Sequence, residues 1–274
     1  MSDLLRPSHR SAIQRHQIAA FLVLTFAWTW TIWAVGIALG YGGTRWIQVV
    51  GAWGPLIGAT VVTKASGGDV RAWAAQVVPN RGVKLRWYGL AFAAPFALTQ
   101  TAVTIGWLIG EPVTLVDTTE IIVAFAVTLF VAGALEEFGW RGFLQPRLQE
   151  RRSALFAAVI VGVVWWLWHV PLLFGGTGAG YESGEAIALL IGLPLFSIVM
   201  AWIYNSTRGG LLFVMLFHAT INTTPVLETD AATAVMGLGE LAVLIGLPLF
   251  IVLYYGREYL AAASPEPPIP GHRP

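Results

Sequence analysis

Long apolar stretches alternate with short polar segments along this chain. Most of the stretches are long enough to cross the ~30 Å hydrocarbon core of a bilayer as an α-helix, which rises ~1.5 Å per residue. The pattern predicts an all-α, polytopic membrane protein with about eight transmembrane helices. The first stretch is too long for the apolar region of a cleaved signal peptide, normally ~7–15 residues, so we expect it to be retained. The predicted helices cover residues 18–39, 46–63, 87–109, 121–135, 155–174, 186–204, 211–226 and 235–255.

The composition independently indicates a membrane protein. Of the 274 residues, 56% are hydrophobic and only 11% are charged, against about 25% charged in soluble domains. The formal net charge is +1, which argues against nucleic acid as a partner because basic side chains are not in surplus. The chain contains no cysteine, and this excludes disulfides, thiolate nucleophiles and cysteine-ligated metals.

The loop charges predict the orientation of the chain. Positively charged residues in short loops stay on the cytoplasmic side of a membrane. With eight helices and the amino terminus inside, nearly all loop arginines and lysines fall in inner segments, and the outer segments carry Arg45 alone. The outer segments also hold most of the acidic residues. We therefore expect both termini to be cytoplasmic and the protein to lie in the inner (cell) membrane.

No internal repeat and no soluble domain is visible, so residues 1–274 are expected to form a single membrane domain. The segments 1–16 and 261–274 are predicted to be disordered tails, and the second is rich in proline. Residues 69–78 have an amphipathic pattern that ends at Pro79, which predicts a short helix on the inner membrane interface. A lip that docks the substrate is the alternative for this helix.

Glu136, Glu137 and Arg141 lie at the end of the fourth apolar stretch, in the segment ALEEFGWRGFLQPRL at 134–148. An ionised side chain at the centre of a bilayer costs at least ~2.5–3.5 kcal/mol on insertion scales, so these groups need partners, water or a function. In a helix, Glu137 and Arg141 are four residues apart and can form a supporting ion pair. Glu136 lies roughly 140° around the helix from Arg141, at ~100° per residue. Glu136 is therefore the carboxylate that is available for chemistry.

Two histidines accompany this motif inside apolar stretches. His169 occurs in WWLWHVPLLF, and His218 lies four residues before Asn222 and on the same helical face. Glu136 and His169 are equidistant from the polar turn at 151–153, so the two helices can bring them together. His218 is roughly 15 Å from the inner surface, at ~1.5 Å per residue. All of these groups can therefore share one site within the membrane.

This combination supports two kinds of hydrolytic site. In the first, Glu136 acts as a general base on water beside His169. His218 and Asn222 then donate hydrogen bonds to the developing oxyanion. In the second, Glu136, His169 and His218 ligate a divalent metal ion, since two histidines and a carboxylate are a common open-site set. The signatures HExxH and GxSxG are absent, so zincin and serine hydrolase sites are not supported.

At these residues the sequence resembles the CPBP family of intramembrane proteases, which includes CAAX-prenyl endopeptidases and bacteriocin-processing and immunity proteins. The motif EExxxR occurs at 136–141, FxxxH ends at His169 with Trp165 in place of phenylalanine, and HxxxN is met by His218 and Asn222. The resemblance covers residues 121–224 and implies endoproteolysis within the membrane, with a catalytic four-helix core that we expect at 119–226. Trp165 keeps an aromatic packing residue, so we expect it to alter the shape of the pocket more than its chemistry.

The resemblance implies that Glu136 and His169 activate water and that His218 and Asn222 stabilise the oxyanion. The family often carries the label metalloprotease, but we favour a metal-free mechanism, because Asn222 lies one helical turn from His218, where an oxyanion donor would lie. Zn²⁺ bound by Glu136, His169 and His218 is the alternative. The expected substrate is a membrane-embedded or lipid-anchored peptide or protein. The rival functions are a transporter or proton relay, and a non-catalytic scaffold or immunity protein.

Overall fold

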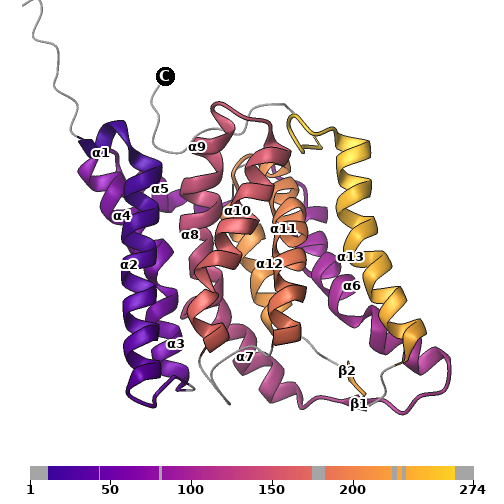
Figure 1. The fold of residues 1–274 in the computed structure, drawn as a ribbon. Helices are drawn as coiled ribbons and strands as arrows, with labels where there is room; N and C mark the ends of the chain where they lie inside the picture. Colours follow the sequence, from indigo (N-terminus) through magenta and orange to yellow (C-terminus); the bar gives the residue numbers. More distant parts are fainter. Residues whose placement is uncertain are drawn as a thin grey trace, which may run out of the picture.

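The computed structural model describes residues 12–42, 44–79, 82–174, 183–223, 227–229 and 233–262. Most of this part of the chain is helical, and the helices form a bundle (Figure 1). The α-helices are α1 (Ala12–Arg15), α2 (Gln17–Ala38), α3 (Arg45–Ala52), α4 (Gly54–Ala65), α5 (Val70–Ala74), α6 (Arg86–Leu108), α7 (Thr118–Phe130), α8 (Glu137–Gly139), α9 (Gln145–Gln149), α10 (Ala154–Trp168), α11 (Ser183–Ser206), α12 (Leu211–Thr223) and α13 (Ala234–Tyr255). The other elements are 3-10 helices at Ala75–Val77, Gly133–Glu136 and Val170–Phe174, a π-helix at Trp140–Leu144, and the short strands β1 (Thr114–Leu115) and β2 (Leu227–Glu228).

The helices that carry the predicted site lie in the middle of the bundle. In Figure 1, α2, α3 and α4 form one side, α6 and α13 form the other, and α8 to α12 lie between them. Strand β1 pairs with β2 in antiparallel orientation, with Thr114 opposite Glu228. This pairing joins the segment before α7 to the segment after α12.

Helices occupy all eight apolar stretches, so the prediction of an all-α, polytopic membrane protein is confirmed. Within the described residues, six helical segments are long and apolar enough to cross a membrane, and α10 and α12 are shorter apolar helices. Helix α1 and the end of α13 lie at the same end of the bundle (Figure 1), as an even number of crossings requires. The number of eight crossings and the cytoplasmic position of the termini stay predictions.

Two of the predicted helices are interrupted at proline. The stretch 46–63 forms two helices, α3 and α4, that are separated at Trp53. Pro55 is the second residue of α4, and because it has no N–H it cannot continue the hydrogen-bond ladder of α3. Helix α10 ends at Trp168 rather than running through Pro171, since a residue before proline avoids the helical conformation. The rest of that stretch is a 3-10 helix.

Both predicted tails were drawn too long at their inner edges. The turn α1 lies within the first predicted tail, and Gln14 donates from Nε2 to a carbonyl oxygen just after α4, at 3.2 Å. At the other end, the backbone N–H of Ala262 donates to a serine hydroxyl at the end of α11, at 2.9 Å. The remaining residues of the two predicted tails, 1–11 and 263–274, lie outside the described residues.

The amphipathic segment 69–78 forms α5 and the 3-10 helix that follows it. The Asp69 carboxylate accepts hydrogen bonds from two backbone N–H groups of the first turn, at 2.9 and 3.0 Å, and so caps the helix. Trp73 is only 1% exposed and donates its indole N–H to the carbonyl oxygen of Gly142 at 2.9 Å. The segment is therefore anchored in the bundle through Trp73. The prediction of a helix lying on the membrane interface did not include this contact.

Close packing of α2 against α4 supports the site from one side. A Cβ at Gly54 would lie 2.1 Å from Thr29 Oγ1, and one at Gly58 would lie 2.6 Å from Thr25 Oγ1. Small residues at such positions allow the backbones of membrane helices to approach closely. Thr29 Oγ1 in turn accepts a hydrogen bond from Trp168 Nε1 at 2.8 Å, so this helix pair holds the end of α10 in place.

Single-cysteine variants test the orientation, because the chain has no cysteine of its own. Glu150→Cys lies in the turn between α9 and α10, and Leu115→Cys lies in β1; both positions are exposed. We expect a membrane-impermeant maleimide to label position 115 in intact cells and position 150 only after permeabilisation. The cysteine-free chain is the control, and labelling of both positions in intact cells would contradict the predicted orientation.

Candidate active site

The charged motif changes its helical pitch three times. A 3-10 helix at Gly133–Glu136 is followed by α8, by the π-helix Trp140–Leu144 and by α9. π-helical turns are rare and frequently occur at functional sites. The carbonyl oxygen of Gly142 in this turn accepts hydrogen bonds from the side chains of Trp73 and Gln76, at 2.9 and 3.3 Å. The irregular turn is therefore held by the segment that contains α5.

Glu137 is the centre of a buried charged group. Arg141 Nη1 donates to both of its carboxylate oxygens, at 3.0 and 2.9 Å, which confirms the predicted ion pair. His218 Nδ1 lies 2.7 Å from Glu137 Oε1, and all three side chains are at most 2% exposed. A carboxylate only accepts hydrogen bonds, so Nδ1 of His218 carries a proton. In the neutral ring the lone pair therefore lies on Nε2.

Glu136 has a different environment from its neighbour. Its Oε2 accepts hydrogen bonds from two indole N–H groups, Trp165 Nε1 at 2.9 Å and Trp140 Nε1 at 3.4 Å. These donors are neutral, so they orient the carboxylate without pairing its charge. Trp165 thus does more than fill space, because the phenylalanine of the family motif has no N–H to donate. The sequence interpretation of Trp165 as a packing residue was incomplete.

His169 lies directly after the last residue of α10, and its orientation is fixed by that helix. Its Nδ1 is 2.8 Å from the carbonyl oxygen of Trp165, and since a carbonyl only accepts, Nδ1 carries the proton. The neutral ring therefore has its lone pair on Nε2. The ring also packs edge-on against Trp168, with centroids 4.8 Å apart. The backbone and an aromatic neighbour together define how His169 faces the site.

A cavity of about 300 Å³, here called the Glu136 cavity, brings the predicted residues together. Glu136, His169 and Asn222 all line it. Its walls come from α2, α3, α7, the 3-10 helix before α8, the end of α10, and α12. His218 is not part of the lining, but its Nε2 reaches the cavity wall at Gly133.

Gly133 is where two side-chain nitrogens of α12 converge. A Cβ at Gly133 would lie 2.7 Å from Asn222 Nδ2 and 3.0 Å from His218 Nε2. Both nitrogens therefore pack against the same side of Gly133 and lie close to each other. Residues three apart in a 3-10 helix are eclipsed, so Gly133 and Glu136 share one edge of their helix. The absence of a side chain at 133 leaves room for both nitrogens on the edge of the helix that carries Glu136.

The three residues proposed as alternative metal ligands are not gathered for that role. Among the residues that the structure describes, no group of three His, Cys, Asp or Glu side chains is placed to hold a metal ion. Glu136 is hydrogen-bonded to the two indoles, and His218 is bonded to Glu137 through Nδ1. These bonds use Oε2 of Glu136 and Nδ1 of His218, so Oε1 and Nε2 are the atoms that would face a metal ion.

Two contributors to the site were not predicted from the sequence. Gly133 precedes the charged motif and carries no signal of its own, because its importance depends on α12, which is far along the chain. Trp140 lies inside the motif, but only the changes of pitch direct its indole N–H to Glu136. The substitution of tryptophan at 165 was visible in the sequence, and its extra N–H donor could have been used to predict the bond to Glu136.

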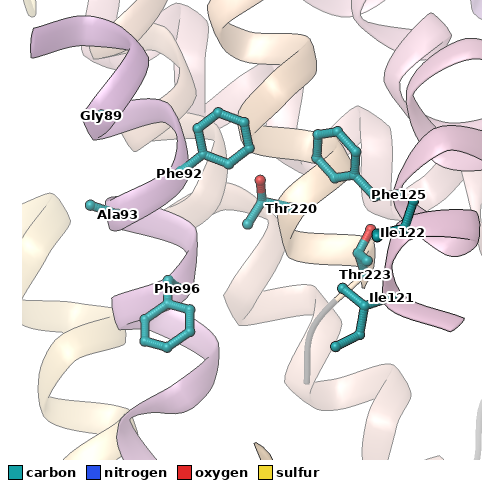
Figure 2. A pocket seen from close by; sticks show the side chains of 9 residues that line it. All are labelled: Gly89, Phe92, Ala93, Phe96, Ile121, Ile122, Phe125, Thr220 and Thr223. Carbon is teal, nitrogen blue, oxygen red and sulfur yellow. The ribbon is translucent and has the colours of Figure 1, made fainter. Parts of the chain in front are cut away.

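A second cavity of about 560 Å³ lies on the other side of α7 and α12. Figure 2 shows Phe92 and Phe96 of α6 facing Phe125 of α7, with Thr220 and Thr223 of α12 behind them. The side-chain hydroxyls of both threonines donate to carbonyl oxygens of their own helix. Among the described residues, no titratable side chain lines this cavity, so they supply no acid or base there.

Comparison with known proteins points to the segment that contains these residues. The family described as Type II CAAX prenyl endopeptidase Rce1-like matches residues 118–224. A CAAX prenyl protease 2 of Methanococcus maripaludis is 32% identical over 132 residues, which are 46% of this chain and 48% of that protein. A lysostaphin resistance protein A of Staphylococcus haemolyticus is 27% identical over 122 residues, 43% of this chain and 31% of that protein.

The chain therefore spans less than half the length of these curated relatives. The matched segment nevertheless contains Glu136, His169, His218 and Asn222, the residues that meet around Gly133 and the Glu136 cavity. Over residues 118–224 the chain is similar to the Rce1-like CAAX prenyl endopeptidases, which supports the resemblance to the CPBP family of intramembrane proteases.

Proposed function

We propose that this protein is an intramembrane endopeptidase of the cell (inner) membrane, which hydrolyses a peptide bond of a membrane-embedded or lipid-anchored protein or peptide. One observation carries the proposal. Glu136, His169 and Asn222 line one cavity, and His218 Nε2 and Asn222 Nδ2 converge beside Gly133 at its wall. Water-mediated peptide hydrolysis needs a base, a group that orients the water, and donors for the oxyanion, all around one small space. Glu136, His169 and the pair of nitrogens are the candidates for these three parts.

Glu136 is the proposed general base. Both hydrogen bonds described for its carboxylate fall on Oε2, so Oε1 is the oxygen that accepts the proton of a water molecule. His169 presents Nε2 as its lone-pair nitrogen and accepts the second hydrogen of that water. The water is then held between two acceptors with its own lone pair toward the scissile carbonyl. Positioned proton transfer of this kind contributes typically ~10²–10⁴-fold to a rate.

Asn222 and His218 are the proposed oxyanion donors. Asn222 Nδ2 is a donor in any protonation state, and His218 Nε2 becomes one when its ring is protonated beside the Glu137 carboxylate. The carbonyl oxygen of the substrate would lie next to Gly133, where both nitrogens can reach it. Donors aimed at developing charge in a water-excluded site are often the largest single contribution to catalysis.

A zinc-dependent version of the same protease is the second mechanism. In that version Glu136 Oε1 and Nε2 of His169 and His218 would have to gather around the ion, while their hydrogen bonds through Oε2 and Nδ1 could stay in place. Asn222 would then have no direct part in the chemistry. The placement of Asn222 on the cavity wall supports the metal-free mechanism. The decisive assay uses purified protein in liposomes with a fluorogenic membrane peptide.

Glu136 and its neighbour should differ in the effect of the same substitution. Glu136→Gln keeps the shape of the side chain, so we expect a folded protein with no measurable cleavage. Glu137→Gln leaves Arg141 buried without its partner, which is destabilising by about 3–5 kcal/mol. Thermal unfolding in detergent should therefore fall for Glu137→Gln and stay near wild type for Glu136→Gln. Wild-type cleavage by Glu136→Gln would refute the assignment of the base.

Asn222→Ala tests the mechanism. Removal of one oxyanion donor typically costs ~10²–10³ in turnover, so we expect that loss with an unchanged metal content by elemental analysis. Wild-type protein should keep its activity after treatment with a strong chelator. Stoichiometric zinc in active protein, with activity lost on stripping and restored on readdition, would establish the metal mechanism instead.

Gly133→Ala tests the convergence of the two donors. The added methyl group would lie 2.7 Å from Asn222 Nδ2, so the amide must move and the oxyanion loses a donor. We expect turnover to fall about as far as in Asn222→Ala, by ~10²-fold. The double variant should lose little more than either single variant, because both remove the same interaction. Gly89→Ala is the matched control, since a Cβ there meets no atom within 4 Å. Full activity of Gly133→Ala would contradict the proposed position of the oxyanion.

A further inference from the structure

The carbonyl group of Val131 loses its helical partner at the point where α7 ends. Helix α7 ends one residue before Val131, and the 3-10 helix Gly133–Glu136 begins two residues after it. In a continuous α-helix the N–H of Leu135 would donate to the Val131 carbonyl oxygen, but here it donates to that of Ala132, at 2.8 Å. A free carbonyl is costly in the hydrocarbon core of a membrane, because water does not bond to it there. The change of pitch therefore creates a need for another donor.

Trp53 supplies this donor. Its indole Nε1 donates to the Val131 carbonyl oxygen at 2.8 Å, across 78 positions of the chain. Trp53 is the residue at which α3 ends and α4 begins. It also lies outside the segment 118–224 that matches the family, so the comparison with relatives does not point to it. The bond ties the break between α3 and α4 to the break that precedes the charged motif.

The same part of the chain contacts the motif again on the far side of its two glutamates. Residues 53–55 are here called the α3–α4 corner. A Cβ at Gly139 would lie 2.5 Å from Pro55 Cβ and 2.7 Å from the Pro55 carbonyl oxygen, so the glycine allows the backbones to approach closely. The corner therefore holds both ends of the segment 131–139, which carries Gly133 and Glu136.

Trp53 is close to the site but is not positioned to touch a substrate. Val49 and Ala52 of α3 line the Glu136 cavity, whereas Trp53 is not part of the lining. Its indole N–H is a neutral donor, and that donor is used on the backbone of Val131. Any influence of Trp53 on the chemistry must therefore pass through the position of the segment that follows Val131.

We propose that Trp53 is a positioning residue, which holds Gly133 and Glu136 on one edge of the 3-10 helix through its bond to the Val131 carbonyl. Without this donor, the carbonyl regains a partner if the N–H of Leu135 returns to it and α7 continues. Residues three apart are eclipsed in a 3-10 helix, but they are about 60° apart in an α-helix at ~100° per residue. Loss of the donor would thus turn Gly133 and Glu136 away from each other.

The inference rests on the proposed protease function for its effect on turnover, and Trp53→Phe tests that effect. The variant keeps an aromatic ring and removes the N–H. Misplacement of catalytic groups by ~1 Å can cost ~10²-fold, so we expect kcat to fall by about that factor while KM stays near wild type. Benzothienylalanine at position 53, in which sulfur replaces the N–H, keeps the shape of the side chain and should give the same loss. A wild-type kcat in that protein would overturn the proposal.

Trp28→Phe is the matched control. The indole N–H of Trp28 also donates to a backbone carbonyl oxygen at 2.8 Å, but the acceptor is Val50 of α3 rather than the segment 131–139. We expect this variant to lower the thermal stability about as far as Trp53→Phe and to keep its kcat. Equal losses of kcat in the two variants would show a general structural effect and would overturn the proposal. Trp53→Phe combined with Gly133→Ala should lose little more than Gly133→Ala alone, because both disturb the same geometry.

Amide hydrogen exchange, followed by mass spectrometry in lipid nanodiscs, tests the contact without any need for cleavage. Loss of one hydrogen bond should make the amides of the segment 131–139 exchange about two- to tenfold faster in Trp53→Phe. Trp28→Phe should leave the exchange of this segment unchanged. Unchanged exchange in Trp53→Phe would overturn the proposal. If exchange rises in Trp53→Phe but wild-type protein cleaves no peptide, the hold on Gly133 and Glu136 is confirmed and the protease function fails.

Discussion

The structure of the site depends on the buried carboxylate of Glu137, which is shared between Arg141 and His218. Charges taken out of water lose several kcal/mol of solvation each, and they are tolerated when they are paired and hydrogen-bonded. The bond of 2.7 Å between His218 Nδ1 and Glu137 Oε1 joins α12 to α8, and Arg141 supplies the cation from within the same segment as Glu137. It also selects the ring nitrogen of His218 that reaches Gly133.

Trp165 connects this ion pair to the proposed base. Arg141 Nε and Nη2 have no hydrogen-bond partner among the described residues, but the guanidinium lies 5.0 Å from the centre of the Trp165 ring. A desolvated contact of this type contributes ~2 kcal/mol or more. The same residue donates its N–H to Glu136 and accepts from His169 through its carbonyl. One side chain and its backbone therefore position an anion, a cation and an imidazole.

The two adjacent glutamates are separated in role by their partners. Glu137 has a cationic partner and a histidine, and it is fully buried. Glu136 has only indole N–H groups and borders a cavity. Neutral donors orient a carboxylate but leave its charge free to act on a bound water molecule or substrate. This division follows from the changes of pitch between 133 and 144, which turn consecutive residues toward different neighbours.

The sequence by itself determined the membrane-spanning class, the approximate positions of the helices and the pairing of Glu137 with Arg141. It also brought together Glu136, His169 and Asn222, which line one cavity. These features follow from local periodicity, from the high cost of charge in a bilayer and from spacings of four residues within one helix. Only the tertiary structure decided that Trp165 bonds to Glu136, that Gly133 faces His218 and Asn222, and that Trp53 bonds to the Val131 carbonyl. Each of these contacts joins segments that are distant in sequence, or depends on 3-10 and π-helical turns whose pitch no hydrophobic pattern specifies. The physical reason is that a sequence pattern records which face of a helix is apolar, whereas the packing of helices decides which atoms meet.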